Sequence, residues 1–406
     1  MPANEAPPTR SYGATVGALA AGQLVCWAAL YYTFSSMVLP MQASLGWGKP
    51  TLMGAFTLGL AVWGGASYAT GAAIDRGHGR AVLTLGAALG GIGFLVWSQA
   101  GAIGWLYVAW ALLGCAMAMT LYEPAFSVLI KRFPERYGDG ITALTLVGGF
   151  ASTLSFPAVA LLQSVLGWRG ALAAIGCVLL LLVAPLHAWA LRGPAPSAPA
   201  RRSASSMAGA DASLRQALRE RAFWMLTLCF TLHAFVAAAL WAHIMPALTA
   251  KGLSEAQSLA VVVWFGPAQV AGRFAYLIAQ RTSRRIGMRA VGVAVLAMMP
   301  AALALFALVD DTLGLLLFAL LFGISNGLIT IVRGVLVPEF FGRAHVGRIG
   351  GAMSGIALIS RAAAPLLTAW ALLWLSGYPA LLLALALLSG LALLAFAFAR
   401  RPAIRA

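Results

Sequence analysis

Charge, and negative charge above all, is scarce in this sequence. Only 9% of the 406 residues are charged and 11 residues are acidic, whereas 61% are hydrophobic. A soluble chain of this length needs far more charge to cover its surface. Runs of about 20 apolar residues recur along the chain, and each is long enough to cross a bilayer as a helix. The sequence therefore predicts a multi-pass, all-α membrane protein.

Cysteine and catalytic signatures are scarce as well. The four cysteines all fall within apolar runs, without a C-x-x-C pair or a metal-ligand spacing, so we expect small core residues, no metal and no cofactor. An integral membrane enzyme is disfavoured, because H-E-x-x-H, paired aspartates within spans and a serine–histidine–acid set at one depth are missing. The N-terminus lacks a basic region leading into a short apolar stretch, which predicts no removable signal peptide. These cysteines are Cys26, Cys115, Cys177 and Cys229.

We expect twelve membrane-spanning helices, with boundaries uncertain by about two to four residues. Their ranges are 13–39, 51–74, 80–99, 104–130, 140–166, 170–191, 222–249, 256–280, 286–309, 312–337, 347–374 and 378–399. The longest break in hydrophobicity divides them six and six. It predicts a six-helix bundle over 1–191, a cytoplasmic linker over 192–221 and a second six-helix bundle over 222–406.

The basic residues predict the orientation of the chain. The net charge of +16 would suggest nucleic acid in a soluble protein, but here the basic residues sit between spans and not on one continuous face, so we expect no nucleic-acid partner. Most of the 27 Lys and Arg fall in alternate gaps, which are cytoplasmic if both termini are cytoplasmic. We therefore expect both termini inside, and we also expect a monomer in a bacterial-type inner membrane.

The break at 192–221 has two parts. It opens as G-P-A-P-S-A-P-A-R-R-S-A-S-S, which is typical of a flexible linker, and ends as D-A-S-L-R-Q-A-L-R-E-R, which predicts a short basic amphipathic helix. Asp211 or Ser213 could cap that helix. We expect this segment to lie along the anionic inner leaflet, and the alternative is a regulatory docking segment.

The turn after the second span carries a motif, G-A-A-I-D-R-G-H-G-R, from Gly71 to Arg80. Gly71 and Gly79 allow close packing and a tight turn, while Asp75 can face the positive end of a neighbouring helix. Arg76 or Arg80 can pair with acids on the inner surface. The alternative reading is an ordinary charged turn.

This motif resembles the G-x-x-x-D-R-x-G-R signature of the major facilitator superfamily, although its last glycine comes one residue late. A weak internal repeat agrees, since R-F-P-E-R-Y-G-D-G-I-T after the fourth span has a counterpart, E-F-F-G-R-A-H-V-G-R-I, after the tenth. The resemblance implies two pseudo-symmetric six-helix bundles around one central site, operating as a secondary transporter by alternating access. A channel would need neither the repeat nor asymmetric gate charges.

Within that superfamily the chain is similar to the monocarboxylate-porter-like branch. The similarity covers C-W-A-A-L-Y-Y-T-F and S-L-G-W-G-K-P near the first span, and A-H-I-M-P-A-L-T-A-K-G-L-S at the end of the seventh. It implies that Arg273 takes the place of an eighth-span arginine that contacts the substrate carboxylate. Gln269 stands where some animal members carry an acid one turn earlier, which puts their proton relay in doubt here. Two signatures of drug/proton antiporters are missing, which weakens multidrug export.

Four charged residues lie inside apolar runs: Glu123, Arg273, Arg333 and Arg361. A guanidinium in mid-membrane costs roughly 2.5 to 3.5 kcal/mol even on the mildest scale. Helix rise places the four about 9 to 20 Å from the inner boundary. Because three cations face one acid, we expect Arg273 and Arg361 to bind an anion, and Glu123 with Arg333 to form a gate that substrate or a proton shifts. The alternative is internal pairing or snorkelling to the inner surface.

Polar residues of the first and seventh spans could complete the cavity. Tyr31, Tyr32, Trp241 and His243 offer hydrogen bonds and aromatic walls, although an aromatic belt or a packed core would explain them equally. His233 lies near the middle of its span and could titrate, but we expect a neighbouring hydroxyl or carbonyl to satisfy it. The predicted cargo is a small organic anion, most simply a monocarboxylate, moved with a proton or by exchange. The alternative is an efflux pump for a larger, cationic or drug-like compound.

Overall fold

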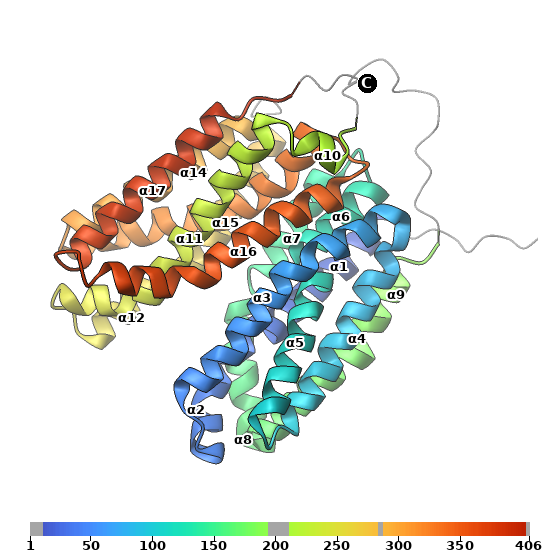
Figure 1. The fold of residues 1–406 in the computed structure, drawn as a ribbon, viewed down its shortest axis with the longest axis horizontal. Coiled ribbons are helices and arrows are strands. Elements are labelled where there is room, and N and C mark those ends of the chain that lie inside the picture. The colour runs from blue at the N-terminus through green and yellow to red at the C-terminus, as the bar shows by residue number, and fades with distance from the viewer. Residues whose placement is uncertain (1–10, 194–210, 283–286, 403–406) are drawn as a thin grey trace, which may run out of the picture. The chain divides into compact units, whose positions relative to one another are not determined.

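The computed structural model describes residues 11–193, 211–282 and 287–402, and all regular structure in these ranges is helical (Figure 1). Three short π-helical segments, labelled η, interrupt the α-helices. The elements up to residue 193 are α1 (Tyr12–Trp27), η1 (Ala28–Tyr32), α2 (Thr33–Leu45), α3 (Lys49–Ala73), η2 (Ile74–His78), α4 (Gly79–Ser98), α5 (Ile103–Thr120), α6 (Tyr122–Arg132), α7 (Tyr137–Gly148), α8 (Ala151–Val178), η3 (Leu179–Val183) and α9 (Ala184–Ala190). The later elements are α10 (Leu214–Ala217), α11 (Arg221–Ala250), α12 (Glu255–Val262), α13 (Phe265–Thr282), α14 (Met288–Leu308), α15 (Thr312–Phe341), α16 (Val346–Ala371) and α17 (Tyr378–Phe398).

Ten helical stretches among the described residues are long and apolar enough to cross a membrane. Two of them are too long for one crossing, and each contains a glycine with positive φ: Gly77 at +93° within Pro50–Ser98, and Gly167 at +68° within Thr153–Ala190. Only glycine adopts this backbone region without strain, so the chain reverses there. When each of these stretches is counted as two helices, the twelve predicted helices are accounted for.

The described chain forms two compact units. Unit 1 holds its residues up to 213 together with 341–355, and unit 2 holds 214–340 and 356–402, outside the undescribed gap. Helix α16 therefore begins in unit 1 and continues in unit 2. The six-plus-six division of the spans at 192–221 stays a prediction.

Glycine contacts bring the helices of unit 1 together. α4 packs along α5 and α8, and α3 packs along α5. A Cβ on Gly93 of α4 would come within 2.9 Å of Leu113, and one on Gly59 of α3 would come within 2.8 Å of Trp110. Without Cβ atoms at these points the helix axes approach closely, as is common between membrane helices.

The core of unit 2 is built on phenylalanines. α14 packs along α17, and α11 also packs on α17. Phe306 and Phe318 stack at 4.3 Å between ring centroids, and Phe265 and Phe322 lie 4.7 Å apart. All four are almost fully buried, so this cluster fixes how α13, α14 and α15 meet.

The predicted linker is only partly within the described residues, because 194–210 lie outside them. Its described end forms α10, a helix of four residues, which is shorter than the amphipathic helix we expected. Asp211 does not cap that helix; its carboxylate accepts hydrogen bonds from the main chain of Arg343 and Ala344.

Among the cysteines, Cys26 and Cys229 are buried as expected, whereas Cys177 is exposed on α8. An exposed thiol is tolerated on an apolar helix because it behaves as a small apolar group.

Candidate functional site

The fourth span is a broken helix, and Glu123 lies at the break. α5 ends at Thr120, Leu121 adopts an extended backbone with ψ of −162°, and α6 starts with Glu123 in its first turn. Pro124 has no N–H to donate to the carbonyl of Thr120, four residues earlier. The amide of the fully buried Gln23 fills this vacancy, donating to Thr120 O at 2.5 Å. Because Glu123 lies in the first turn of α6, the positive end of this helix favours a carboxylate there.

A small cavity, with room for about one water molecule, adjoins Glu123 in unit 1. Its polar lining includes Ser67 and Thr70 of α3 and Ser127 of α6. The Ser67 hydroxyl donates to Trp63 O at 2.7 Å, and the Ser127 hydroxyl donates to Glu123 O at 2.9 Å. Since both hydroxyl hydrogens are engaged, these oxygens can only accept, so the cavity suits a proton donor or a small cation.

Tyr31 and Tyr32 lie on η1, a π-helical segment in the first span. The widened turn leaves the carbonyl of Ala28 to accept from two hydroxyls, Thr33 at 3.1 Å and Ser155 at 2.8 Å. Single π-turns occur frequently at functional sites.

An aromatic cluster connects these tyrosines to the fourth span. The ring of Trp27 lies 5.6 Å from Tyr31 and 4.9 Å from Tyr122, the residue next to Glu123. Trp27 also lies 6.0 Å from Trp63, which lines the small cavity. Unit 1 therefore brings Tyr31, Tyr32 and Glu123 into one region.

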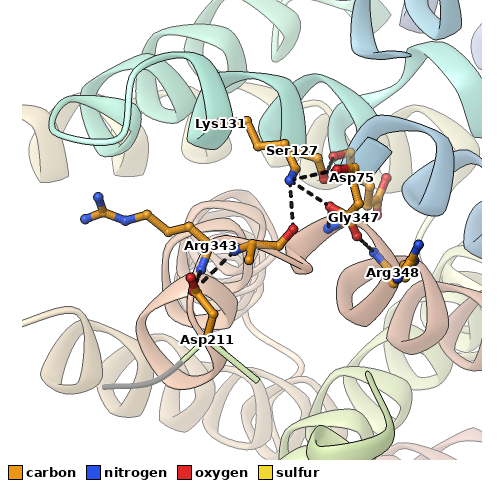
Figure 2. Close-up of polar contacts among 9 residues, drawn as sticks. Asp75, Ser127, Lys131, Asp211, Arg343, Gly347 and Arg348 are labelled. Carbon is orange, nitrogen blue, oxygen red and sulfur yellow. Dashed lines mark hydrogen bonds and ion pairs between the residues drawn. The ribbon is translucent and has the colours of Figure 1, made fainter. Parts of the chain in front are cut away.

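Asp75 of the predicted motif caps the start of α16. Its side chain is 2% exposed and accepts from Gly347 N at 3.0 Å and Arg348 N at 2.8 Å (Figure 2). These amides belong to the first turn of α16, whose N–H groups have no partner within the helix. Lys131 of α6 adds an ion pair to Asp75 at 3.3 Å and donates to Ala344 O at 2.8 Å.

In the motif, close packing and the tight turn depend on different glycines, whereas we predicted that the same two glycines serve both. A Cβ on Gly71 would overlap the carbonyl of Gly347, and one on Gly79 would come within 2.7 Å of Val128, so both permit close packing. The tight turn itself is made by Gly77, with φ of +93°.

The two arginines of the motif show no ion pair with an acid in the described parts of the chain. Arg80 instead donates to Ala188 O at 2.9 Å, at the end of α9, and Arg76 is exposed. A cation at a helix C-terminus is favourable, which gives Arg80 a structural role.

Arg273 of α13 is 3% exposed. Its Nε donates to Gly327 O of α15 at 3.1 Å, while its Nη1 is buried and has no hydrogen-bond partner among the described residues. The helices meet closely here, because a Cβ on Gly327 would lie 2.9 Å from the main chain of Gln269. Gln269, half-buried, lies one turn before Arg273 on α13. The arginine is thus anchored at one atom and has donors to spare.

Arg361 and His233 interact electrostatically in unit 2. Arg361 is half-buried on α16 and makes no hydrogen bond or ion pair within the described ranges. His233 of α11 is 4% exposed, and neither of its ring nitrogens has a partner in the part of the chain that the structure describes. The expectation that a neighbouring hydroxyl or carbonyl satisfies His233 is therefore wrong.

The remaining predicted residues of unit 2 make local contacts. His243 Nε2 lies 3.0 Å from Thr368 Oγ1, and that hydroxyl donates to Ala364 O at 2.6 Å, so His243 must be the donor to Thr368. The Trp241 ring packs edge-on against Phe265 at 5.3 Å. The guanidinium of Arg333 lies 5.7 Å from the ring of Phe230. A gating pair of Arg333 with Glu123 stays a prediction.

Sequence reasoning missed Gln23 and Lys131, and it assigned Asp211 to the wrong helix end. The signal for Gln23 was available, because Pro124 frees a carbonyl four residues earlier. Lys131 and Asp211 bind main-chain groups that are more than 100 residues away in sequence, and no local pattern indicates such partners.

Comparison with known proteins identifies the family. The sequence profile of the Major Facilitator Superfamily matches residues 19–365. The chain belongs to this superfamily. Its members are membrane transporters and not enzymes, so the chain is a multi-pass secondary transporter for a small molecule.

Two curated relatives match parts of the sequence. The chain is 34% identical over 170 residues to an uncharacterized 38 kDa protein of the 23S RNA operon of Thermoproteus tenax, covering 41% of this chain and 44% of that protein. It is 32% identical over 145 residues to human monocarboxylate transporter 11, covering 35% of this chain and 31% of that protein. The matched region thus spans less than half the length of either relative.

Solved structures of the superfamily share the fold over nearly the whole chain. The fucose:proton symporter of E. coli superimposes with a TM-score of 0.75 at 14% identity, covering 97% of this chain and 100% of the symporter. The human organic anion transporter MFSD10 gives 0.70 at 16% identity, covering 94% and 99%. At such low identity the likeness establishes the fold alone.

Proposed function

We propose that this chain transports a small organic anion, most simply a monocarboxylate, and that Arg273 binds its carboxylate. The observation that carries the proposal is a guanidinium, 3% exposed, held at Nε by one carbonyl while Nη1 has no partner among the described residues. A buried cation with N–H groups that lack acceptors has a high free energy, and a bound anion would lower it by accepting from those groups. A carboxylate is the natural ligand, because its two oxygens match the planar fork of arginine.

Arg361 supplies a second cation in the same unit, and His233 lies within its electrostatic reach. Arg361 has no acid or carbonyl partner within the described ranges, and His233 has two unused ring nitrogens there. A solute that carries a hydroxyl or keto oxygen beside its carboxylate, as lactate and pyruvate do, would use such donors. This favours 2-hydroxy and 2-oxo acids among the monocarboxylates.

Glu123 is the residue that we propose for coupling to protons. It stands at the start of α6 beside a cavity that presents hydroxyl oxygens as acceptors. A carboxylate in a broken membrane helix can take up a proton in one state of a transport cycle and release it in another. The names of two relatives, a monocarboxylate transporter and an organic anion transporter, agree with the proposed cargo.

The alternative, efflux of a larger drug-like compound, has one observation in its favour. The rings of Trp27, Tyr31, Tyr32, Trp63 and Tyr122 form a connected aromatic cluster in unit 1, of which the first three are half-buried. Such rings would suit a planar, hydrophobic solute better than lactate.

The test is uptake into proteoliposomes that contain the purified full chain. Labelled lactate, pyruvate, benzoate and a cationic dye are compared, each with and without an inward proton gradient. We expect an acid to be taken up by the wild type and by Cys115→Ala, and not by Arg273→Gln. If Arg273→Gln transports every acid normally, the site is wrong; if only the dye moves, the efflux alternative replaces the proposal.

The role of Glu123 is tested in the same vesicles. Glu123→Gln cannot release a proton, so gradient-driven uptake should fail while exchange of internal for external acid persists. Equal loss of both modes would show that Glu123 serves binding or folding and not coupling.

A further inference from the structure

The turn between α15 and α16 is held by two acids from distant parts of unit 1. Asp211, at the end of the linker, accepts from Arg343 N at 2.7 Å and Ala344 N at 3.2 Å. Asp75 accepts from two amides a few residues further on, those of Gly347 and Arg348. Figure 2 shows the two carboxylates at separate points of the same turn. Between them they engage four main-chain donors, in two pairs of adjacent residues, at the turn and the start of α16.

Two neighbouring features place Asp211 at this turn. Ala212 N donates to Phe341 O at 2.9 Å, which fixes the linker beside the end of α15. The next residue, Gly342, has φ of +81°, and a Cβ there would overlap the carboxylate of Asp211. A glycine at this point both ends α15 and makes room for the acid.

Lys131 joins the two capped segments. Its ammonium contacts Asp75 at 3.3 Å and donates to Ala344 O at 2.8 Å, in the residue whose N–H goes to Asp211 (Figure 2). Displacement of the turn from Asp75 would therefore pull on Ala344 and, through it, on the bond to Asp211. The surrounding surface contributes less, because the pair of Arg343 with Glu135 is exposed and 3.7 Å long.

We propose that Asp211 is a releasable latch. Through Asp211 the linker holds the α15–α16 turn in the state seen here, and the contacts of Asp211 and Asp75 with this turn break together. Asp75 and Asp211 then act as one device, with Lys131 as the connection. The linker becomes part of the mechanism of the transporter and not a passive tether. A static staple, by contrast, would hold its own two amides whatever happens at Asp75.

Hydrogen–deuterium exchange of the full chain separates these two cases without a substrate. We expect Asp211→Asn to speed exchange about tenfold or more at Arg343 and Ala344, because a charged acceptor becomes neutral. We also expect it to speed exchange at Gly347 and Arg348. Asp75→Asn should have the same effect on all four amides, and Gly342→Ala should reproduce Asp211→Asn.

The matched control is Asp310→Asn, which alters an exposed aspartate whose ion pair with Lys251 lies in unit 2. It should leave the turn unchanged. Peptides from α4 and α5, which pack together in unit 1, report whether each variant is folded. If each acid affects only its own two amides, the contacts are independent staples and the latch is refuted. If Asp211→Asn leaves Arg343 and Ala344 unchanged, the contact itself is refuted.

Discussion

Asp75 and Arg273 are both almost fully buried charges, but they differ in how completely their hydrogen-bonding groups are paired. Asp75, in unit 1, receives two main-chain amides and an ammonium. Arg273, in unit 2, has one carbonyl at Nε and an unused buried Nη1 within the described ranges. The hydrogen bonds of Asp75 are complete, whereas the proposal above assigns the unused donor of Arg273 to a ligand. Stability and transport should therefore respond separately to changes at the two positions.

The largest effect is expected at Arg273. Arg273→Lys keeps the charge but replaces a planar fork with a compact ammonium, which cannot make two parallel bonds to a carboxylate. Uptake of the preferred acid should fall about 30-fold or more, since loss of a buried charged contact costs roughly 2 kcal/mol or more. The melting temperature in detergent should change little. A large fall in melting temperature with uptake per folded protein unchanged would reverse the comparison and make Arg273 structural.

Asp75 should show the reverse pattern. Asp75→Asn weakens two charge-assisted bonds and the pair with Lys131, so we expect a loss of about 1.5 to 3 kcal/mol in the free energy of unfolding, measured by thermal or denaturant melting. Lys131→Met should also destabilise the protein. Because the two residues are in contact, the double variant should lose less than the sum of the single losses. Additive losses would mean that the observed pair carries no coupling.

This contrast shows where sequence reasoning succeeds. The spans follow from runs of apolar residues, and the buried charges stand out against them, so the fold and the position of Arg273 could be predicted. The partners could not. Gly347, which receives Asp75, and Gly327, which receives Arg273, are apolar residues that act through their main chain. The prediction for His233 relied on what is usual for a lone histidine in an apolar helix, namely a hydroxyl or carbonyl partner. Packing instead left its ring nitrogens without a partner among the described residues.

A smaller effect should appear where α16 packs on α3. A Cβ on Gly351 would lie 2.5 Å from Ser67 O, whereas one on the adjacent Gly350 would meet nothing within 4 Å. Gly351→Ala should therefore destabilise unit 1 by about 1 to 3 kcal/mol through overpacking. Gly350→Ala, the control, should be neutral or slightly stabilising, because alanine favours the helix. Equal melting temperatures would show that α16 can move away from α3 without cost.

The smallest expected effect is the difference between two glutamines that make the same kind of hydrogen bond but differ in burial. Pro40 and Pro124 each free the carbonyl four residues earlier, and Gln163 and Gln23 donate to those carbonyls, Ser36 O at 3.1 Å and Thr120 O at 2.5 Å. Gln23 is fully buried, so Gln23→Leu leaves Thr120 O without a donor and should cost about 1 to 3 kcal/mol.

Gln163 is only partly buried, and its carbonyl partner can find another donor at the surface, so Gln163→Leu should cost less than about 1 kcal/mol. Thermal melting of the two variants side by side measures the difference. Because Thr120 closes α5 just before Glu123, Gln23→Leu should also slow gradient-driven uptake, whereas Gln163→Leu should not. If both variants melt and transport alike, the break in the fourth span is held by its backbone and not by the amide of Gln23, and Glu123 would keep its place without that support.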